Sequence, residues 1–209
     1  MFTHASIFLS SFIIAFSGAM MPGPLLTVTI SESSKKGFIA GPLLILGHGF
    51  LELVLVAALL LGLAPLLQKK IVFSSIGISG GIILLWMSFS MFKSIPDLNL
   101  SSQTDVKRDG YIIINGILFS ISNPYWTIWW ATIGMAYILQ SMNYGISGVL
   151  SFFAGHILAD LIWYASISYA VSKGKNLLSN VLYRIIIGFC AAILMIFGGF
   201  FFIKGLNSF

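Results

Sequence analysis

Two histidine–carboxylate pairs are the residues of this sequence whose types and spacing could do chemistry. Glu52 follows His48 by four residues, and Asp160 follows His156 at the same spacing. Residues four apart on a helix share a face, so each histidine should lie beside its acid. Such pairs could hold an ammonium group, relay a proton or bind a divalent metal. The alternative is a set of polar side chains that only bridge neighbouring helices.

Two proline segments accompany these pairs. Pro22-Gly23-Pro24 lies near the middle of one long apolar stretch, and Asn123-Pro124 lies near the middle of another. Proline cannot donate to the helix ladder and clashes with the preceding turn, so both stretches should be broken helices. Proline also suits the first position of a helix. The half-helices beginning near Pro24 and Pro124 could therefore point N–H groups at an anion, unless each break is a simple kink.

Aromatic residues follow the second proline segment. Tyr125, Trp126, Trp129 and Trp130 form two pairs at helical spacing on adjacent faces. One face, with Trp126, could supply a cation–π wall for an ammonium group. Packing or an interfacial aromatic belt is the alternative interpretation.

The composition places these residues in a membrane protein. Of the 209 residues, 58% are hydrophobic and only 8% are charged, and the mean hydropathy is +1.00. Ordinary soluble chains carry about 25% charged residues, so a water-soluble enzyme is excluded. The single cysteine, Cys190, excludes an internal disulfide framework. The net charge of +5 is scattered, without the basic stripe that a nucleic-acid partner requires, and no cofactor is expected.

Segments free of charge predict an all-α, polytopic fold with six transmembrane helices in the lipid bilayer. A span needs about 20 apolar residues, and runs such as 53–63 lack the alternation of β-barrel strands. The predicted spans are roughly 6–30, 39–66, 71–92, 111–139, 145–172 and 183–204. Glu32, Lys35 and Lys36 are expected in a solvated cytoplasmic loop between the first two spans.

Basic residues predict the orientation, because Lys and Arg are in excess in cytoplasmic loops. Eight of them follow spans one, three and five, and three lie on the opposite side. The larger group is Lys35, Lys36, Lys93, Lys107, Arg108, Lys173, Lys175 and Arg184, and the smaller is Lys69, Lys70 and Lys204. Both termini are therefore predicted to lie outside the cytoplasm.

The same order of helices occurs twice in the chain. A proline-broken helix is followed by a helix with a Gly-His-x-x-x-acid motif and then by a plain helix. Because three is odd, the two halves must enter the membrane from opposite faces, as in the inverted repeats of secondary transporters. The sequence thus predicts one transmembrane domain, 1–209, with repeat one at 1–92, a cytoplasmic loop at 93–110 and repeat two at 111–209.

The proline and histidine motifs together resemble the LysE/RhtB family of lysine and homoserine exporters. The resemblance rests on Pro22-Gly23-Pro24, Gly47-His48 and Asn123-Pro124, and it covers nearly the whole chain. It implies a six-span protein of the inner membrane that exports an amino acid or a similar small amphoteric solute and is not an enzyme.

The two acids are the first candidates for the transport chemistry. A charge at the bilayer centre costs at least about 2.5–3.5 kcal/mol on insertion scales, so Glu52 and Asp160 should face protein or water. We expect proton antiport, in which one acid carries a proton and the other holds the substrate ammonium, with His48 and His156 as relays. A divalent metal-ion transporter using all four residues is the main alternative. An intramembrane hydrolase ranks last, because the His-Glu-x-x-His pattern is absent.

Small residues predict close contacts elsewhere. Gly77-x-x-x-Gly81 in the third span and Gly198-Gly199 in the sixth would let helix backbones approach. Such contacts could also support a homodimer.

Overall fold

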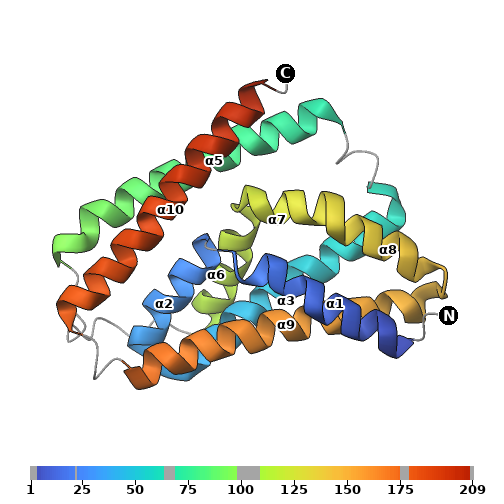
Figure 1. Cartoon of the computed structure of the whole chain (residues 1–209), viewed down its shortest axis with the longest axis horizontal. Helices are drawn as coiled ribbons and strands as arrows, with labels where there is room; N and C mark the ends of the chain where they lie inside the picture. The colour runs from blue at the N-terminus through green and yellow to red at the C-terminus, as the bar shows by residue number, and fades with distance from the viewer. Residues whose placement is uncertain (1–3, 22, 64–68, 98–108, 175–178, 208–209) are drawn as a thin grey trace.

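The chain folds into a bundle of helices that differ greatly in length (Figure 1). The computed structural model describes residues 4–21, 23–63, 69–97, 109–174 and 179–207, and no strand occurs among them. The helices are α1 (His4–Ala19), α2 (Pro24–Lys36), α3 (Ala40–Ala58), α5 (Lys70–Ser94), α6 (Asp109–Ile121), α7 (Pro124–Trp129), α8 (Met135–Met142), α9 (Gly145–Gly174) and α10 (Asn180–Asn207). Short 3₁₀ turns occupy Gly37–Ile39 and Ile95–Asp97, and π-helical turns occupy Leu59–Leu63 and Trp130–Gly134.

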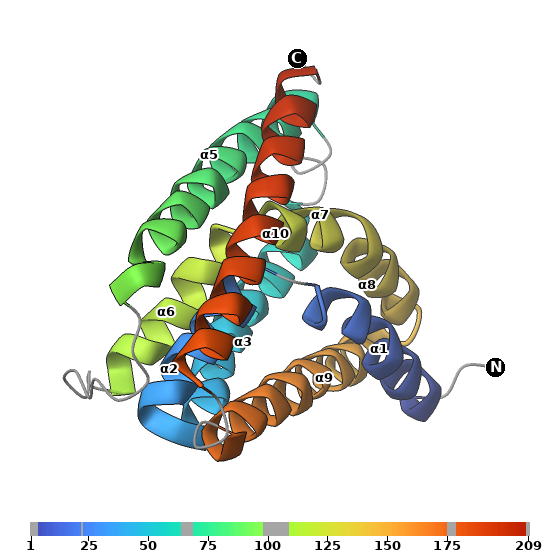
Figure 2. The same cartoon turned by 60° about the vertical axis from the view of Figure 1, so that its left-hand side comes forward.

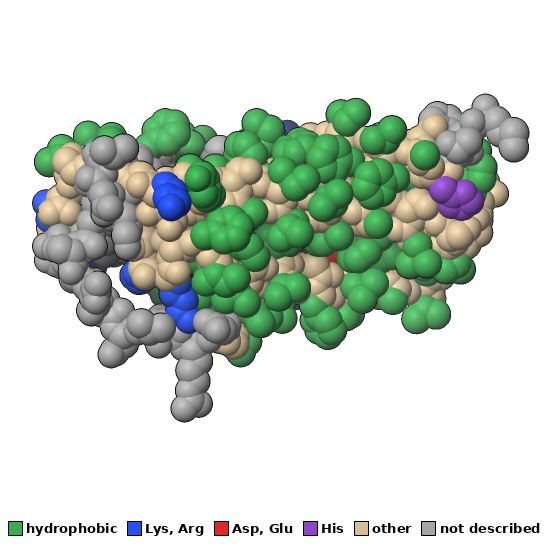
Figure 3. All heavy atoms as spheres, turned by 90° about the horizontal axis from the view of Figure 1, so that it is seen from below, with side chains coloured by type: hydrophobic (Ala, Val, Ile, Leu, Met, Phe, Trp, Pro, Cys, Tyr) green, Lys and Arg blue, Asp and Glu red, His purple; other side chains and the backbone are tan. Residues whose placement is uncertain are grey.

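Four helical stretches in the described parts of the chain are long and apolar enough to cross a membrane. They are Pro24–Gly62, Lys70–Lys93, Gly145–Gly174 and Asn180–Asn207, and two shorter apolar helices, His4–Ala19 and Gly110–Ile121, accompany them. On the face shown in Figure 3, hydrophobic side chains cover the middle and Lys and Arg side chains gather toward one end. The all-α fold is confirmed for the described residues, and these apolar helices fit a multi-pass membrane protein.

The two expected breaks occur at the predicted places. The predicted first span is divided between α1 and α2, and the predicted fourth span is divided between α6 and α7. Pro22 lies outside the described residues, but Gly23 is the N-cap of α2 and Pro24 is its first residue. Pro124 likewise begins α7, with Asn123 as its N-cap. Each proline thus starts a helix at a position where its missing N–H costs nothing.

The first connection differs from the expected solvated loop. Helix α2 continues through Lys36, and Glu32 is buried at 6% exposure. The reason is that the buried face of α2 extends by one more turn against α9, where the Ser33 and Ser168 hydroxyls lie 2.7 Å apart. The polar residues of this segment led to the prediction of a solvated loop, and that prediction is wrong. The expected loop at 93–110 falls largely on residues outside the described part, as do Lys107, Arg108 and Lys175.

Helix pairs organise the bundle (Figures 1 and 2). Helix α5 packs along α10, α1 packs along α9, and α3 packs along α6. Glycines permit the first of these contacts, because a Cβ on Gly81 would lie 2.7 Å from the backbone nitrogen of Phe202 and one on Gly198 would lie 3.1 Å from the Gly81 carbonyl. Gly199, by contrast, has open space around it. The predicted close approach of the third and sixth spans is confirmed.

Two apolar clusters flank the centre of the bundle. One contains Trp130 and Phe152, which are among the largest fully buried side chains, and the other contains Leu44 and Tyr164. The middle segments of α3 and α9, with their polar residues, lie between these clusters. The two apolar clusters therefore hold the polar residues of α3 and α9 in place from both sides.

Candidate functional site

The two histidine–carboxylate pairs meet at the centre of the bundle, close to the breaks in both broken helices. All four residues are buried, with at most 5% of each residue exposed. They line a pocket whose empty volume, including its mouth, is about 490 Å³, together with residues of the α1–α2 break, the α6–α7 break and the start of α7. We call these four residues the quartet: His48, Glu52, His156 and Asp160.

Glycines bring the helices that carry the quartet into close contact with their neighbours. Gly47 precedes His48 on α3, and a Cβ at this position would collide with the Ile113 carbonyl of α6. Gly155 precedes His156 on α9, and a Cβ there would collide with the Phe8 carbonyl of α1. Only a residue without a side chain permits these approaches. The glycine in each Gly-His motif thus has a packing role.

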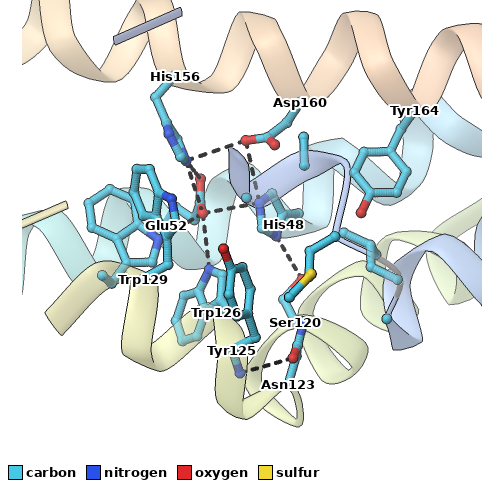
Figure 4. A pocket seen from close by; sticks show the side chains of 16 residues that line it. His48, Glu52, Ser120, Asn123, Tyr125, Trp126, Trp129, His156, Asp160 and Tyr164 are labelled. Carbon is cyan, nitrogen blue, oxygen red and sulfur yellow. Dashed lines mark hydrogen bonds and ion pairs between the residues drawn. The ribbon is translucent and has the colours of Figure 1, made fainter. Parts of the chain in front are cut away.

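Both histidines face both acids (Figure 4). The His48 Nε2 atom lies 3.0 Å from Glu52 Oε1 and 3.6 Å from Asp160 Oδ2. The His156 Nε2 atom lies 3.1 Å from Glu52 Oε2 and 3.3 Å from Asp160 Oδ2. The i,i+4 pairs predicted within each helix are therefore joined across helices into one polar cluster.

Glu52 receives additional donors from the aromatic segment. The indole N–H groups of Trp126 and Trp130 donate to Glu52 Oε1 at 3.0 and 2.8 Å. Hydrogen bonds to a charged group are worth about 1.5–3 kcal/mol each, so this pair helps to hold the Glu52 side chain in place. These two indoles were predicted to offer their ring faces to an ammonium group. In the structure their N–H edges donate hydrogen bonds to an acid.

The other two aromatic residues bind the first helix. The Tyr125 hydroxyl donates to the Ser17 carbonyl at 3.0 Å, and the Trp129 indole donates to the Ser17 hydroxyl at 3.1 Å. The Trp129 ring also lies 4.7 Å from the His156 ring, centroid to centroid. These contacts fix α7 against the end of α1 beside the quartet.

Ser120 on α6 sets the orientation of His48. The Ser120 hydroxyl donates to the Gly116 carbonyl at 2.6 Å, and its oxygen lies 2.7 Å from His48 Nδ1. Because the hydroxyl has one proton and that proton is used, we infer that His48 Nδ1 carries a proton and donates it. The Nε2 atom of a neutral His48 is then an acceptor, yet it faces carboxyl oxygens. A further proton must lie on Nε2 or on an acid.

Each acid of the quartet keeps one buried oxygen that makes no hydrogen bond in the described structure. These atoms are Glu52 Oε2 and Asp160 Oδ2, and imidazole nitrogens lie near both. Tyr164, one helical turn further along α9, lines the same pocket and turns its ring toward it (Figure 4). Asp160 therefore retains capacity to accept a donor.

The two helix breaks lie against one another and differ in their caps. A Cβ on Gly23 would lie 3.2 Å from the Asn123 amide nitrogen. The Asn123 side chain accepts from the Tyr125 N–H at 3.1 Å, whereas Gly23 offers no side-chain cap to α2. The first N–H groups of a helix have no partner within it. Those of α2 are thus the less satisfied of the two sets.

Three of the quartet residues could also share a divalent cation. Ligand atoms of His48, Glu52 and Asp160 all lie within 4.8 Å of one another, and Zn²⁺ accepts imidazole and carboxylate ligands. However, one oxygen of Glu52 already accepts two indole N–H groups.

Most of the residues predicted from sequence lie at this centre. The structure brings together the quartet, Gly23, Asn123 and Trp126, all of which line the pocket. Ser120, Trp130 and Tyr164 add to it. The four-residue spacing from Asp160 to Tyr164 is a signal that could have indicated the tyrosine, but nothing in the sequence distinguishes Ser120 from the other serines.

Comparison with known proteins extends over almost the whole chain. The LysE type translocator family profile matches residues 16–205. A protein of Bacillus subtilis (strain 168), "Putative amino acid efflux protein YcgF", is 23% identical over 205 residues, which cover 97% of this chain and 98% of the relative. No solved structure matches the chain.

Proposed function

This chain belongs to the LysE type translocator family, and on that premise we propose that it is a transporter that exports amino acids across the cytoplasmic membrane. The observation that carries the proposal is the buried quartet at the junction of two broken helices. Ionisable groups inside a membrane protein mark substrate and proton pathways. The name of the Bacillus subtilis relative, an amino acid efflux protein, supports the same substrate class.

We propose that the chain forms one domain of six spans in two inverted repeats, 1–92 and 111–209. Reciprocal contacts support this arrangement. Gly47 of the first half packs on α6 of the second, and Gly155 of the second half packs on α1 of the first. The helix breaks also occupy equivalent places, with α2 and α7 each starting at a proline. Transporters of this plan place their substrate at the repeat interface near the bilayer midplane.

The energy source that we propose is proton antiport. The hydrogen bonds of His48 require a proton within the quartet beyond the one on Nδ1. Two neighbouring buried acids titrate as a coupled pair, so the substrate ammonium can replace this proton and the proton can replace the ammonium. Entry of a proton from outside would then drive export, with the histidines as relays.

The basic residues suggest how the chain is oriented in the membrane. We propose that both termini lie outside the cytoplasm, because the larger group of Lys and Arg residues belongs to the connections after spans one, three and five. A homodimer would use lipid-exposed helix faces. Crosslinking of the protein in native membranes would test this assembly.

Transport by the purified protein in liposomes tests the proposal. Vesicles are given labelled amino acids, or Mn²⁺ and Zn²⁺ as the second candidate cargo, with and without an imposed pH gradient. We expect a pH gradient to drive accumulation of amino acids and not of metals. Metal transport without amino-acid transport would favour the second candidate, which the closely spaced ligand atoms of His48, Glu52 and Asp160 support. Transport of neither class would contradict the proposed function.

The Glu52→Gln variant connects this experiment to the quartet. A glutamine can still accept the two indole N–H groups through its amide oxygen, so the fold should be retained. We expect loss of pH-driven accumulation. Full pH-driven accumulation by this variant would show that Glu52 is not needed for coupling.

A further inference from the structure

Two carboxyl oxygens in the pocket have no hydrogen-bond partner among the described residues. They are Glu52 Oε2 and Asp160 Oδ2, and both residues are at most 3% exposed. Buried polar atoms normally have a partner, so two acceptors without one need an explanation. Both acids point toward the same imidazoles (Figure 4). A cation bound between the two carboxylates would satisfy both oxygens at once.

The spacing of the surrounding ligand atoms matches a zinc ion. Zinc bonds to imidazole nitrogen and carboxylate oxygen are about 2.0–2.2 Å long, so two ligands of a tetrahedral ion lie about 3.3–3.6 Å apart. His48 Nε2 lies 3.0 Å from the Glu52 carboxylate and 3.6 Å from Asp160 Oδ2. Ligand atoms of these three residues all lie within 4.8 Å of one another. Small movements of the side chains would therefore place all three around one ion.

The other polar atoms of two of these ligands are already held by neighbours. His48 Nδ1 lies 2.7 Å from the Ser120 hydroxyl, and Glu52 Oε1 accepts from two indole N–H groups at 3.0 and 2.8 Å. Outer partners of this kind orient metal-binding histidines and carboxylates. The Nδ1 atom of His156, by contrast, is buried without a partner in the described structure. His48 is therefore the better prepared imidazole ligand.

From these observations we propose that His48, Glu52 and Asp160 bind Zn²⁺, and that the bound ion blocks transport instead of being carried. His48 and Glu52 lie on α3 of the first half and Asp160 lies on α9 of the second, so the ion bonds the halves together. Transporters built from inverted repeats work by movement of one repeat against the other. The ion also occupies the carboxylates that would receive a substrate ammonium. The block rests on the proposed function, whereas the zinc site does not.

Zinc binding by the purified protein in detergent tests the site without a transport measurement. ZnCl₂ is titrated in a buffer that does not chelate it, and the heat of binding and the melting temperature are recorded. We expect one Zn²⁺ per chain and a melting temperature that rises with zinc concentration, because an ion that binds the folded state stabilises it. No saturable binding at one ion per chain would overturn the proposal.

Two variants locate the bound ion. Asp160→Asn removes a ligand and should weaken binding about ten-fold or more, at least as much as the loss of an outer partner. His4→Gln is the control, because His4 is an exposed histidine at the start of α1 that bonds the Ser147 hydroxyl at 2.9 Å. It should bind zinc as the unmodified protein does. Unchanged affinity in Asp160→Asn, or equal losses in both variants, would overturn the assignment to the quartet.

A second pair of variants tests His48 without removing any ligand. Ser120→Ala removes the partner of His48 Nδ1, and we expect zinc affinity to fall about 10- to 100-fold, as is typical when an outer partner is lost. Ser122→Ala removes a hydroxyl that donates to the Leu118 carbonyl and should leave the affinity unchanged. Equal affinities in the two variants would overturn His48 as a ligand.

Exchange in liposomes tests the block. Vesicles loaded with an unlabelled amino acid take up the same labelled amino acid at equal pH, with and without Zn²⁺ on both sides. Zinc at about ten times its dissociation constant should slow exchange about ten-fold, because about a tenth of the chains remain free.

The outcomes separate the block, the site and the proposed function. Unchanged exchange at saturating zinc would overturn the block and leave the site standing. Accumulation of radioactive zinc in the vesicles would show that the metal is cargo, and would also overturn the block. No amino-acid exchange even without zinc would contradict the proposed function and the block together, while the titration in detergent still decides the zinc site.

Discussion

Replacement of Ser120 by alanine should disturb the quartet without touching any of its four residues. The Ser120 hydroxyl connects the Gly116 carbonyl to His48 Nδ1, at 2.6 and 2.7 Å. The alanine variant leaves the buried His48 Nδ1–H without an acceptor and releases the ring to rotate. Ser122 is the matched control, because it makes the same bond to the Leu118 carbonyl at 2.7 Å and does not line the pocket.

The expected magnitude follows from the loss of one buried partner. A buried donor left unsatisfied costs about 1–3 kcal/mol, which corresponds to a change of about 5- to 150-fold in an equilibrium constant. Loss of the bond at Ser122 should cost about 0.5 kcal/mol or less, as for ordinary surface positions. The difference between the two variants therefore isolates the contact with His48.

Two measurements check this prediction. The free energy of unfolding in mixed detergent micelles should fall by about 1–3 kcal/mol more in Ser120→Ala than in Ser122→Ala. Amino-acid transport in liposomes, normalised to folded protein, should also fall in Ser120→Ala. Equal unfolding free energies in the two variants would refute the hydrogen-bond argument. Normal transport by a destabilised Ser120→Ala would refute the need for a fixed His48 ring.

Four further perturbations address the packing, the coupling, the anion site and the topology. Gly155→Ala should lower the free energy of unfolding by about 1–3 kcal/mol, since its Cβ would collide with α1. Gly199→Ala is the control, because Gly199 has open space around it and the variant should not be destabilised. Equal melting temperatures of the two variants would contradict this account of the α1–α9 contact. Asp160→Asn should fold but fail to accumulate substrate under a pH gradient. Accumulation by this variant would show that Asp160 has a structural role and is not needed for proton coupling. Substrate analogues amidated at the α-carboxyl should bind about ten-fold or more weakly, because a charge-assisted bond to the N–H groups after Gly23 is lost; equal affinity for acid and amide would leave the break as a kink. A periplasm-dependent reporter fused after Phe209 should be active, and activity only of a cytoplasmic reporter would reverse the predicted orientation.

The sequence by itself determined the membrane environment and the helical fold. Low charge and long apolar runs leave few other structures in lipid, because every backbone polar group must be satisfied within the chain. Proline geometry then located the breaks, since Pro24 and Pro124 can begin a helix but cannot continue one. These properties are local, and local sequence is sufficient to predict them.

The spacing of the quartet was also visible in the sequence, but the roles of its members were not. The i,i+4 rule placed each histidine beside the acid of its own helix. It could not show that both histidines would face both acids, because this depends on how closely α3 and α9 approach their neighbours at Gly47 and Gly155. The distinction between Glu52 and Asp160 depends likewise on Trp126 and Trp130, which reach Glu52 from residues more than seventy positions away.

Tertiary packing also overruled one local signal. The polar residues around Glu32 suggested a solvated loop, yet the helix continues and buries Glu32 because Ser33 meets Ser168 of α9. A polar side chain costs free energy to bury unless it gains a hydrogen-bond partner, and the local sequence does not show whether a neighbouring helix provides one. The sequence therefore determined which groups are present along each helix, and the contacts between helices decided which of them are satisfied and which remain open to a substrate.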